Sequence, residues 1–339
     1  MLEKILLGTY TRQTSQGIYQ VLLDTEKQEL TNLTLVTKET SPTYLAQSQA
    51  QNLYTVTAVD GQGGCGAYDA QFQLINTVTK DGAPLCYVAV DEARQLVYGA
   101  NYHLGEVTVY QIEPNGAITL CETIRHTDPT GTHPNQNSAH VHYTDLTPDQ
   151  RLVVCDLGTD RVYTYDVSTT GKLSEVAQYQ AEDQTGPRHL VFHPNQKTAY
   201  LFGELDSTIT VLNYDQTTGR FAALQKISTL PAGFEGENGG AALRVTKDGQ
   251  FLYASNRGHN SIVAYAIDEH TQQLTLIQHS STHGDHPRDF ALNDSDDFLV
   301  CANQTTNNLT LYRRDLQTGL LSLCQKDFTV PEAVCVLFT

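Results

Sequence analysis

Short apolar runs separated by polar turns recur along this chain. One unit begins at Gly186 and reads GPRHLVFHPNQKTAYLFGE, with apolar runs at residues 190–192 and 199–202 and a His-Pro-Asn turn between them. Runs this short, rich in aromatic and aliphatic residues and bounded by turn formers, favour hairpin strands over helices. The pattern therefore predicts an all-β protein.

The same unit repeats through most of the sequence. Clear copies begin at Asn137, Gly239 and Asp285, and weaker copies begin at Ser41 and Ala83. The residues interpreted as opening the third strand of each copy are Ala67, Val107, Val162, Ile209, Ile262 and Leu309. Their spacing is roughly 40 to 55 residues, and four strands at such a period predict the blades of a propeller.

The two ends of the chain each hold part of a seventh unit. Residues 5–36 contain only the later strands of a blade, whereas residues 331–339 contain only an opening strand. We expect the C-terminal segment to supply the innermost strand of this blade, because closure of a propeller removes exposed strand edges. The prediction is a seven-bladed β-propeller, closed by pairing the C-terminal strand with the N-terminal blade, in a single domain that spans residues 1–339.

Composition narrows the classes of partner. The net charge is −17, with 38 acidic and 21 basic residues, which argues against nucleic acid or an anionic membrane as a partner. The sequence holds no apolar run of about 18 residues and no signal-peptide pattern at its start. Seven scattered cysteines without CxxC spacing are typical of reduced, buried side chains. We expect a cytoplasmic protein.

Chemically able residues recur at two positions of the unit. Two arginines, Arg188 and Arg288, lie just before the innermost strand of their units. Two histidines, His142 and His189, are interpreted as occupying the next equivalent position. The end of the following strand carries Glu204, Arg257 and Gln304. Equivalent positions of successive blades are expected to face one another around a central channel. Together these residue types provide proton transfer and anion recognition, as a small anionic substrate with a hydrolysable bond requires.

These motifs resemble those of the seven-bladed 6-phosphogluconolactonase family, which also includes a fungal carboxymuconate lactonising enzyme. The resemblance covers essentially the whole chain, and it is carried by LLGTYT, HVHYTDLTPDQRLVVCDLGTDRV, GPRHLVFHPN, LYASNRGHNSI and HPRDFAL. The lactonising enzyme's active-site set matches His142, Arg188, Glu204 and Arg257. The resemblance implies hydrolysis of 6-phosphogluconolactone, in the pentose phosphate pathway, at a site without metal or cofactor. One departure is Ala241-Ala242-Leu243-Arg244, where many relatives have an acidic residue before the strand.

Lactone hydrolysis assigns roles to these residues. We expect Glu204 to act as the general base and His142 as the acid, although the two roles could be exchanged. Arg257 and Arg188 would hold a phosphate or polarise the carbonyl, because planar guanidinium groups bind phosphate through paired hydrogen bonds. Substrate-binding candidates are Arg288, His189 and Gln304.

Three alternatives stay open. A cycloisomerase acting on a carboxylated muconate needs the same residue types. A non-enzymatic binding scaffold resembling WD40 propellers is a second, although the chain has no Trp and lacks the GH and WD signatures. A calcium-dependent lactonase is the third, since oxygen ligands recur at one strand-end position: Asn101, Asp156, Asn256 and Asn303. These side chains could equally cap loop backbones. The Gly-rich segment 231–240 is interpreted as a surface connection rather than a lid.

Overall fold

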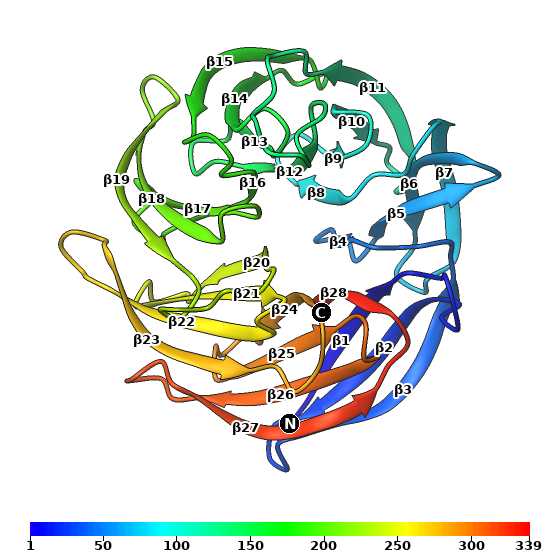
Figure 1. Ribbon diagram of the computed structural model, residues 1–339. Coiled ribbons are helices and arrows are strands. Elements are labelled where there is room, and N and C mark those ends of the chain that lie inside the picture. Colours follow the sequence, from blue (N-terminus) through cyan, green and yellow to red (C-terminus); the bar gives the residue numbers. More distant parts are fainter. The chain divides into compact units, whose positions relative to one another are not determined.

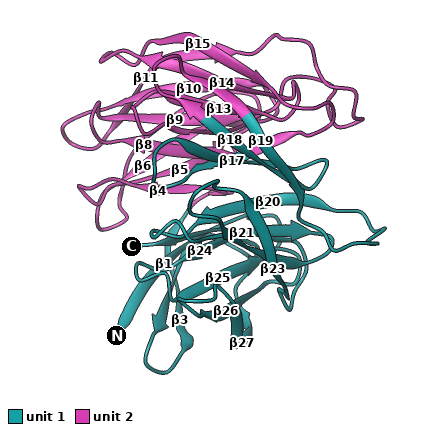
Figure 2. Ribbon diagram, turned by 90° about the vertical axis from the view of Figure 1, so that its left-hand side faces the viewer, with its two compact units in different colours: residues 1–38, 189–213, 223–339 teal, residues 39–188, 214–222 magenta.

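The computed structural model describes all 339 residues, and its regular elements are 28 β-strands. The strands form seven antiparallel sheets of four strands each (Figure 1). The chain divides into two compact units (Figure 2). Unit 1 comprises Met1–Lys38, His189–Asn213 and Ala223–Thr339, and unit 2 comprises Glu39–Arg188 and Tyr214–Ala222. The seven four-stranded sheets are the predicted blades.

Unit 2 contains three complete blades. The first consists of β4 (Leu45–Gln47), β5 (Leu53–Val59), β6 (Gln62–Tyr68) and β7 (Leu74–Asp81). The second consists of β8 (Tyr87–Asp91), β9 (Leu96–Asn101), β10 (Glu106–Ile112) and β11 (Ile118–Arg125). The third consists of β12 (Val141–Leu146), β13 (Leu152–Asp156), β14 (Arg161–Val167) and β15 (Leu173–Gln180). In each blade, consecutive strands are hydrogen-bonded neighbours.

Unit 1 also contains three complete blades. Two of them are β20 (Gly239–Val245), β21 (Phe251–Arg257), β22 (Ser261–Ile267) and β23 (Leu274–Ser281), and then β24 (Pro287–Leu292), β25 (Phe298–Asn303), β26 (Asn308–Arg314) and β27 (Leu321–Thr329). The third is β28 (Ala333–Phe338), β1 (Leu2–Thr9), β2 (Gly17–Asp24) and β3 (Glu29–Lys38). The remaining blade holds β16 (Pro187–Phe192), β17 (Thr198–Gly203), β18 (Thr208–Asp215) and β19 (Arg220–Ser228), and the chain passes between the two units within it.

The predicted third-strand residues are right in five blades and wrong in one. Five of them are the second residue of their strand: Val107, Val162, Ile209, Ile262 and Leu309. Ala67 instead lies near the end of β6, whose second residue is Gly63. A two-residue turn at Asp60 and Gly61, both with positive φ, joins β5 to β6. The sequence hid this start because β6 begins with Gln and two glycines rather than with an apolar residue.

One blade is built from both ends of the chain, as predicted. β28 pairs antiparallel with β1, with Ile5 opposite Phe338 and Thr9 opposite Ala333 (Figure 1, red beside blue). The blade packs its apolar face on β25 and β26 of the preceding blade, and Ile5 and Val336 are among the buried residues of this shared core. The C-terminal strand is therefore part of the hydrophobic core as well as a hydrogen-bonded neighbour.

Glu332 ties the loop between β1 and β2 to the start of β28. Its carboxylate accepts hydrogen bonds from the backbone N–H groups of Arg12, Gln13, Thr14 and Ser15, at 3.0–3.1 Å. Burial alone would raise the pKa of Glu332, but the four N–H donors outweigh it, so the pKa is lowered from its ordinary value of 4.5. Folding therefore favours the ionised form of this carboxyl group.

We expect Glu332→Gln to lower the free energy of unfolding by about 2 kcal/mol at pH 7, because an amide oxygen replaces an ionised acceptor of four bonds. A carboxyl group whose pKa is lower in the folded state stabilises the fold fully at pH values above its pKa in the unfolded state, which is near 4.5. This stabilisation is lost as the pH falls through the pKa of the folded state. Urea unfolding of both proteins at pH 7, 5 and 4 should show a difference that shrinks with acidity. A difference that is constant across this range would contradict the assigned role.

Segment 231–240 has the features of the predicted surface connection. Glu235 and Glu237 are exposed. Asn238 holds the end of the segment, since its side chain donates to Ser207 Oγ at 2.8 Å and to Asn256 Oδ1 at 3.0 Å. The segment is thus anchored directly before β20.

Candidate active site

A β-bulge defines the first of the two functional positions. The pairing register shifts on either side of His142 in β12, and it shifts in the same way on either side of Arg288 in β24. Each of these residues is the extra residue of its bulge, and a bulge turns a side chain out of the regular alternation of a strand. His142 and Arg288 therefore occupy equivalent positions in their blades.

This register corrects the sequence alignment of the histidines. Arg188 is the second residue of β16 and follows a proline, as Arg288 does in β24, so His142 matches Arg188 rather than the position after it. His189 then matches Tyr143, one residue further along the strand. The equivalence of His142 and His189 was wrong because HVHY alternates polar and apolar residues in either register, and a bulge leaves no mark in that pattern.

The second functional position is confirmed as equivalent in three blades. Glu204, Arg257 and Gln304 each lie four residues before the first residue of the third strand. Two aromatic residues that the sequence reasoning missed share this position. Tyr102 has the same spacing from β10. Tyr10 donates its backbone N–H to Glu332 O just as Gln304 donates its N–H to His286 O. The acceptor His286 lies two residues before the bulge residue Arg288, and Glu332 lies two residues before the counterpart of that residue in β28.

Glu204 and Arg257 form a largely buried ion pair in unit 1. Glu204 Oε2 lies 2.8 Å from Arg257 Nη2, and the two side chains are 19% and 9% exposed. The same nitrogen donates to Gly240 O at 2.8 Å. A Cβ atom at Gly239 would approach it to 3.0 Å, so the glycine leaves room for the guanidinium group. The pair favours an ionised Glu204, as a general base requires.

Arg257 has spare hydrogen-bonding capacity. Its Nε atom is buried and has no acceptor in the protein. Burial lowers the pKa of Arg257, the Glu204 carboxylate opposes that effect, and the nearby charge of Arg288 lowers the pKa again. The repulsive effect of Arg288 and the Nε–H group without an acceptor both favour an anionic ligand beside Arg257. Unit 1 brings Glu204, Arg257 and Arg288 together.

His142 belongs to an aromatic cluster in unit 2. It is buried, and its ring lies edge-on to Tyr102 at 5.9 Å between centroids. Tyr102 in turn stacks on His140 at 4.2 Å. The two ring nitrogens of His140 bond to Tyr102 O at 2.9 Å and to Asn137 Oδ1 at 3.1 Å, which gives His140 a structural role. The parts that His142, Arg188 and His189 play in the site stay predictions.

The Asn and Asp side chains considered as calcium ligands are engaged with loop backbones. Asn101 donates to Ala83 O, and Asn303 donates to Thr282 O, at 2.8 and 3.0 Å. Asp156 accepts N–H groups through Oδ1 and contacts His126 through Oδ2. Asn256 bridges to Thr229. The structure contains no cluster of three or more His, Cys, Asp or Glu side chains suited to a metal ion. This geometry favours the capping interpretation.

Four of the seven cysteines have the character of buried apolar side chains, and the other three are partly exposed. All seven are free thiols. Burial raises the pKa of Cys65 to about 12, and it also raises the pKa values of Cys155 and Cys301. A reactive cysteine needs a lowered pKa and access to solvent, so a catalytic thiolate at these positions is disfavoured.

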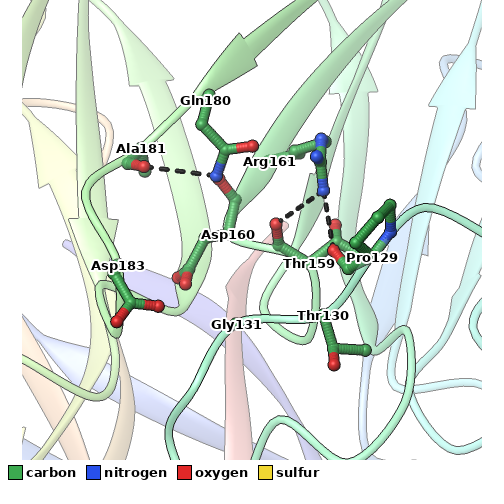
Figure 3. A pocket seen from close by; sticks show the side chains of 9 residues that line it. All are labelled: Pro129, Thr130, Gly131, Thr159, Asp160, Arg161, Gln180, Ala181 and Asp183. Carbon is green, nitrogen blue, oxygen red and sulfur yellow. Dashed lines mark hydrogen bonds between the residues drawn. The ribbon is translucent and has the colours of Figure 1, made fainter.

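A hollow of about 270 Å³ lies in unit 2, and none of the predicted site residues lines it (Figure 3). Its walls are Pro129, Thr130, Gly131, Thr159, Asp160, Arg161, Gln180, Ala181 and Asp183. Asp160 accepts the backbone N–H groups of Gly186 at 2.7 Å and Gln184 at 2.9 Å. It thereby fixes the turn that leads into β16 and Arg188. These contacts give Asp160 a positioning role in the loop.

Comparisons with known proteins identify the family. A family model described as a seven-bladed β-propeller lactonase matches residues 4–338. A 6-phosphogluconolactonase of Bacillus subtilis is 38% identical over 340 residues, with 98% of this chain and 97% of that protein covered. The chain belongs to the seven-bladed β-propeller lactonase family, which confirms the predicted family and fold class.

Solved structures agree with this assignment. A protein of Lactobacillus plantarum has a TM-score of 0.98 and 52% identity, with both chains fully covered. A periplasmic gluconolactonase of Pseudomonas aeruginosa has a TM-score of 0.91 and 28% identity, with 100% of this chain and 99% of that chain covered. No helix long and apolar enough to cross a membrane is present.

Proposed function

We propose that this protein hydrolyses 6-phosphogluconolactone to 6-phosphogluconate, a reaction of carbohydrate metabolism in the pentose phosphate pathway. The observation that carries the proposal is the Glu204–Arg257 ion pair, which offers an ionised base beside a buried guanidinium donor without an acceptor. The Bacillus subtilis relative supports the choice of substrate. The seven cysteines without disulfide bonds support a cytoplasmic location.

The reaction needs a proton acceptor, an oxyanion ligand and a proton donor. Glu204 accepts a proton from a water molecule as the water oxygen attacks the lactone carbonyl carbon. Arg257 keeps Glu204 ionised, and its Nε–H group is available to the developing oxyanion. Collapse of the tetrahedral intermediate breaks the bond to the ring oxygen, which takes a proton and becomes the hydroxyl of the sugar acid.

The proposal keeps the roles of two further residues from the family pattern. His142 donates the proton to the leaving ring oxygen, a task suited to imidazole near neutral pH. Arg188 serves as an anion ligand for the substrate, with His189 and Gln304 as further binding residues. A cycloisomerase acting on a carboxylated muconate would use the same groups, so the choice between the two reactions belongs to experiment.

The decisive experiment compares three lactones with purified protein: 6-phosphogluconolactone, glucono-δ-lactone and carboxymuconolactone. We expect kcat/KM for the phosphorylated lactone to exceed that for glucono-δ-lactone by about tenfold or more, since charge-assisted hydrogen bonds to phosphate are strong. We also expect full activity after treatment with EDTA, because proton transfer and charge stabilisation come from side chains in this mechanism. Activity confined to carboxymuconolactone would overturn the substrate, and loss of activity on chelation, restored by calcium, would overturn the metal-free mechanism.

A further inference from the structure

Two arginine side chains of unit 1 contact the same aromatic ring, and neither guanidinium group has a carboxylate partner. The guanidinium carbon of Arg12 lies 3.9 Å from the centroid of Tyr10, and that of Arg288 lies 5.8 Å from it. The other arginines of this unit are ion-paired, namely Arg244, Arg257, Arg313 and Arg314. Acidic residues outnumber basic ones by 38 to 21 in this chain. Two neighbouring arginines left without a carboxylate therefore mark a locally positive place on an acidic protein.

The backbone that carries Arg12 is held in place. Glu332 binds four consecutive N–H groups of the loop, from Arg12 to Ser15, and Tyr10 donates its own N–H to Glu332 O at 3.0 Å. The side chain of Arg12 is exposed and that of Tyr10 is half-buried. A cation on a fixed loop, stacked on a ring, loses less conformational freedom when it binds a ligand than a free arginine would.

One arginine of the pair, Arg288, lies near the proposed catalytic residues. Burial lowers the pKa of Arg257, the partner of Glu204, and the charge of Arg288 lowers it further. Arg257 Nε has no acceptor, and the buried amide oxygen of Gln304 has no donor. Gln304 is joined to the chain just before Arg288 by the bond from its N–H to His286 O, at 3.1 Å. Two polar groups with unused hydrogen-bonding capacity therefore lie near Arg288.

We propose that Arg12, Tyr10 and Arg288 form a subsite for the phosphate group of the substrate, beside the Glu204–Arg257 pair. The inference rests on the proposed function and deepens it, because it assigns phosphate recognition to one set of arginines and chemistry to another. Guanidinium groups bind phosphate oxygens through paired hydrogen bonds, and the ring of Tyr10 keeps both cations oriented. A phosphate monoester, with nearly two negative charges at pH 7, fits a pair of unpaired cations better than a single carboxylate does.

Binding of the reaction product tests the subsite without turnover. Titration calorimetry with 6-phosphogluconate and with gluconate measures the Kd of each ligand, and the ratio of the two Kd values is the preference for the phosphorylated ligand. We expect this preference in the native protein and a loss of about tenfold in each of Arg12→Ala and Arg288→Ala, the scale of one charge-assisted contact. Arg12→Lys, which keeps the charge without the planar group, should lose part of the preference. Arg313→Ala is the matched control, since Arg313 also lies over a ring, at 4.8 Å from Phe298, but has a carboxylate partner.

The same variants, assayed for kcat/KM on both lactones, distinguish failure of the subsite from failure of the proposed function. A native protein that hydrolyses no lactone, yet binds 6-phosphogluconate through Arg12 and Arg288, would refute the function and leave the subsite intact. A native protein without preference for the phosphorylated ligand would overturn the subsite. Variants that keep the native preference, or that weaken the binding of both ligands equally, would also overturn the subsite.

Discussion

Replacing Glu204 by glutamine should lower kcat for lactone hydrolysis by about 100-fold or more, the scale typical of a lost general base. Glutamine has nearly the same size and can still accept a hydrogen bond from Arg257 Nη2, which lies 2.8 Å from the carboxylate. It cannot take a proton from water. The KM should change little, because the substitution removes an interaction that acts in the transition state. Initial rates over a range of substrate concentrations give both constants.

Glu106→Gln is the matched control for this experiment. Glu106 is also a buried glutamate paired with an arginine, since its Oε1 lies 2.8 Å from Arg125 Nη2, but it has no part in the proposed mechanism. This variant should keep its kcat even where its stability falls. Near-normal kcat in Glu204→Gln would show that Glu204 is not the base, and it would make His142 the first candidate.

Deleting residues 331–339 should abolish soluble folding, an effect far larger than nine residues suggest. β28 buries Ala333, Val334, Cys335 and Val336, each no more than 3% exposed. Burial of one large apolar side chain contributes about 1.5–3 kcal/mol, so the strand's loss approaches the roughly 5–15 kcal/mol net stability of a typical domain. β1 would also expose an unpaired edge, which invites aggregation. Soluble yield, light scattering and circular dichroism measure the outcome.

A circular permutant separates loss of the strand from loss of the chain end. Thr339 donates its N–H to Lys4 O at 3.1 Å, so a short linker can join the last residue to Met1. New ends opened in the exposed turn at residues 268–272 leave all 28 strands present. This permutant should fold and remain soluble. A soluble, cooperatively folding truncation would instead show that β28 is dispensable.

Much of the fold could be predicted because hydrophobic patterning repeats with the blades. Residues 5–36 lack the opening strand of a blade, and residues 331–339 hold only such a strand, so the sequence predicted that the two segments join. β28 pairs with β1 accordingly. Ala67 was misplaced because the hairpin before it turns in two residues and continues into glycines. Glycine has no side chain with which to mark a buried strand.

The site was predicted less completely, for two physical reasons. A β-bulge shifts His142 by one residue relative to the alternation of its strand, and alternation is the register signal that a strand itself carries in the sequence. Tyr10 and Arg12 were missed because their loop is longer than the turns of two to four residues at the same place in the other blades, so spacing did not align them with Gln304. The hydrogen bond from Tyr10 to Glu332 supplied the equivalence that spacing could not.

The blade shared by both ends also governs when the protein can finish folding during translation. β1, β2 and β3 leave the ribosome before every other strand of the propeller, and β28, which completes their sheet, leaves after all of them. The contact between Arg12 and Glu332 joins residues 320 positions apart. At roughly 5–20 residues per second, the chain beyond β3 takes on the order of 15–60 s to synthesise. For that time the nascent chain carries an incomplete sheet with a free edge. Any ribosomal pause before the codons of β28 prolongs the interval in which this edge can pair with another nascent chain.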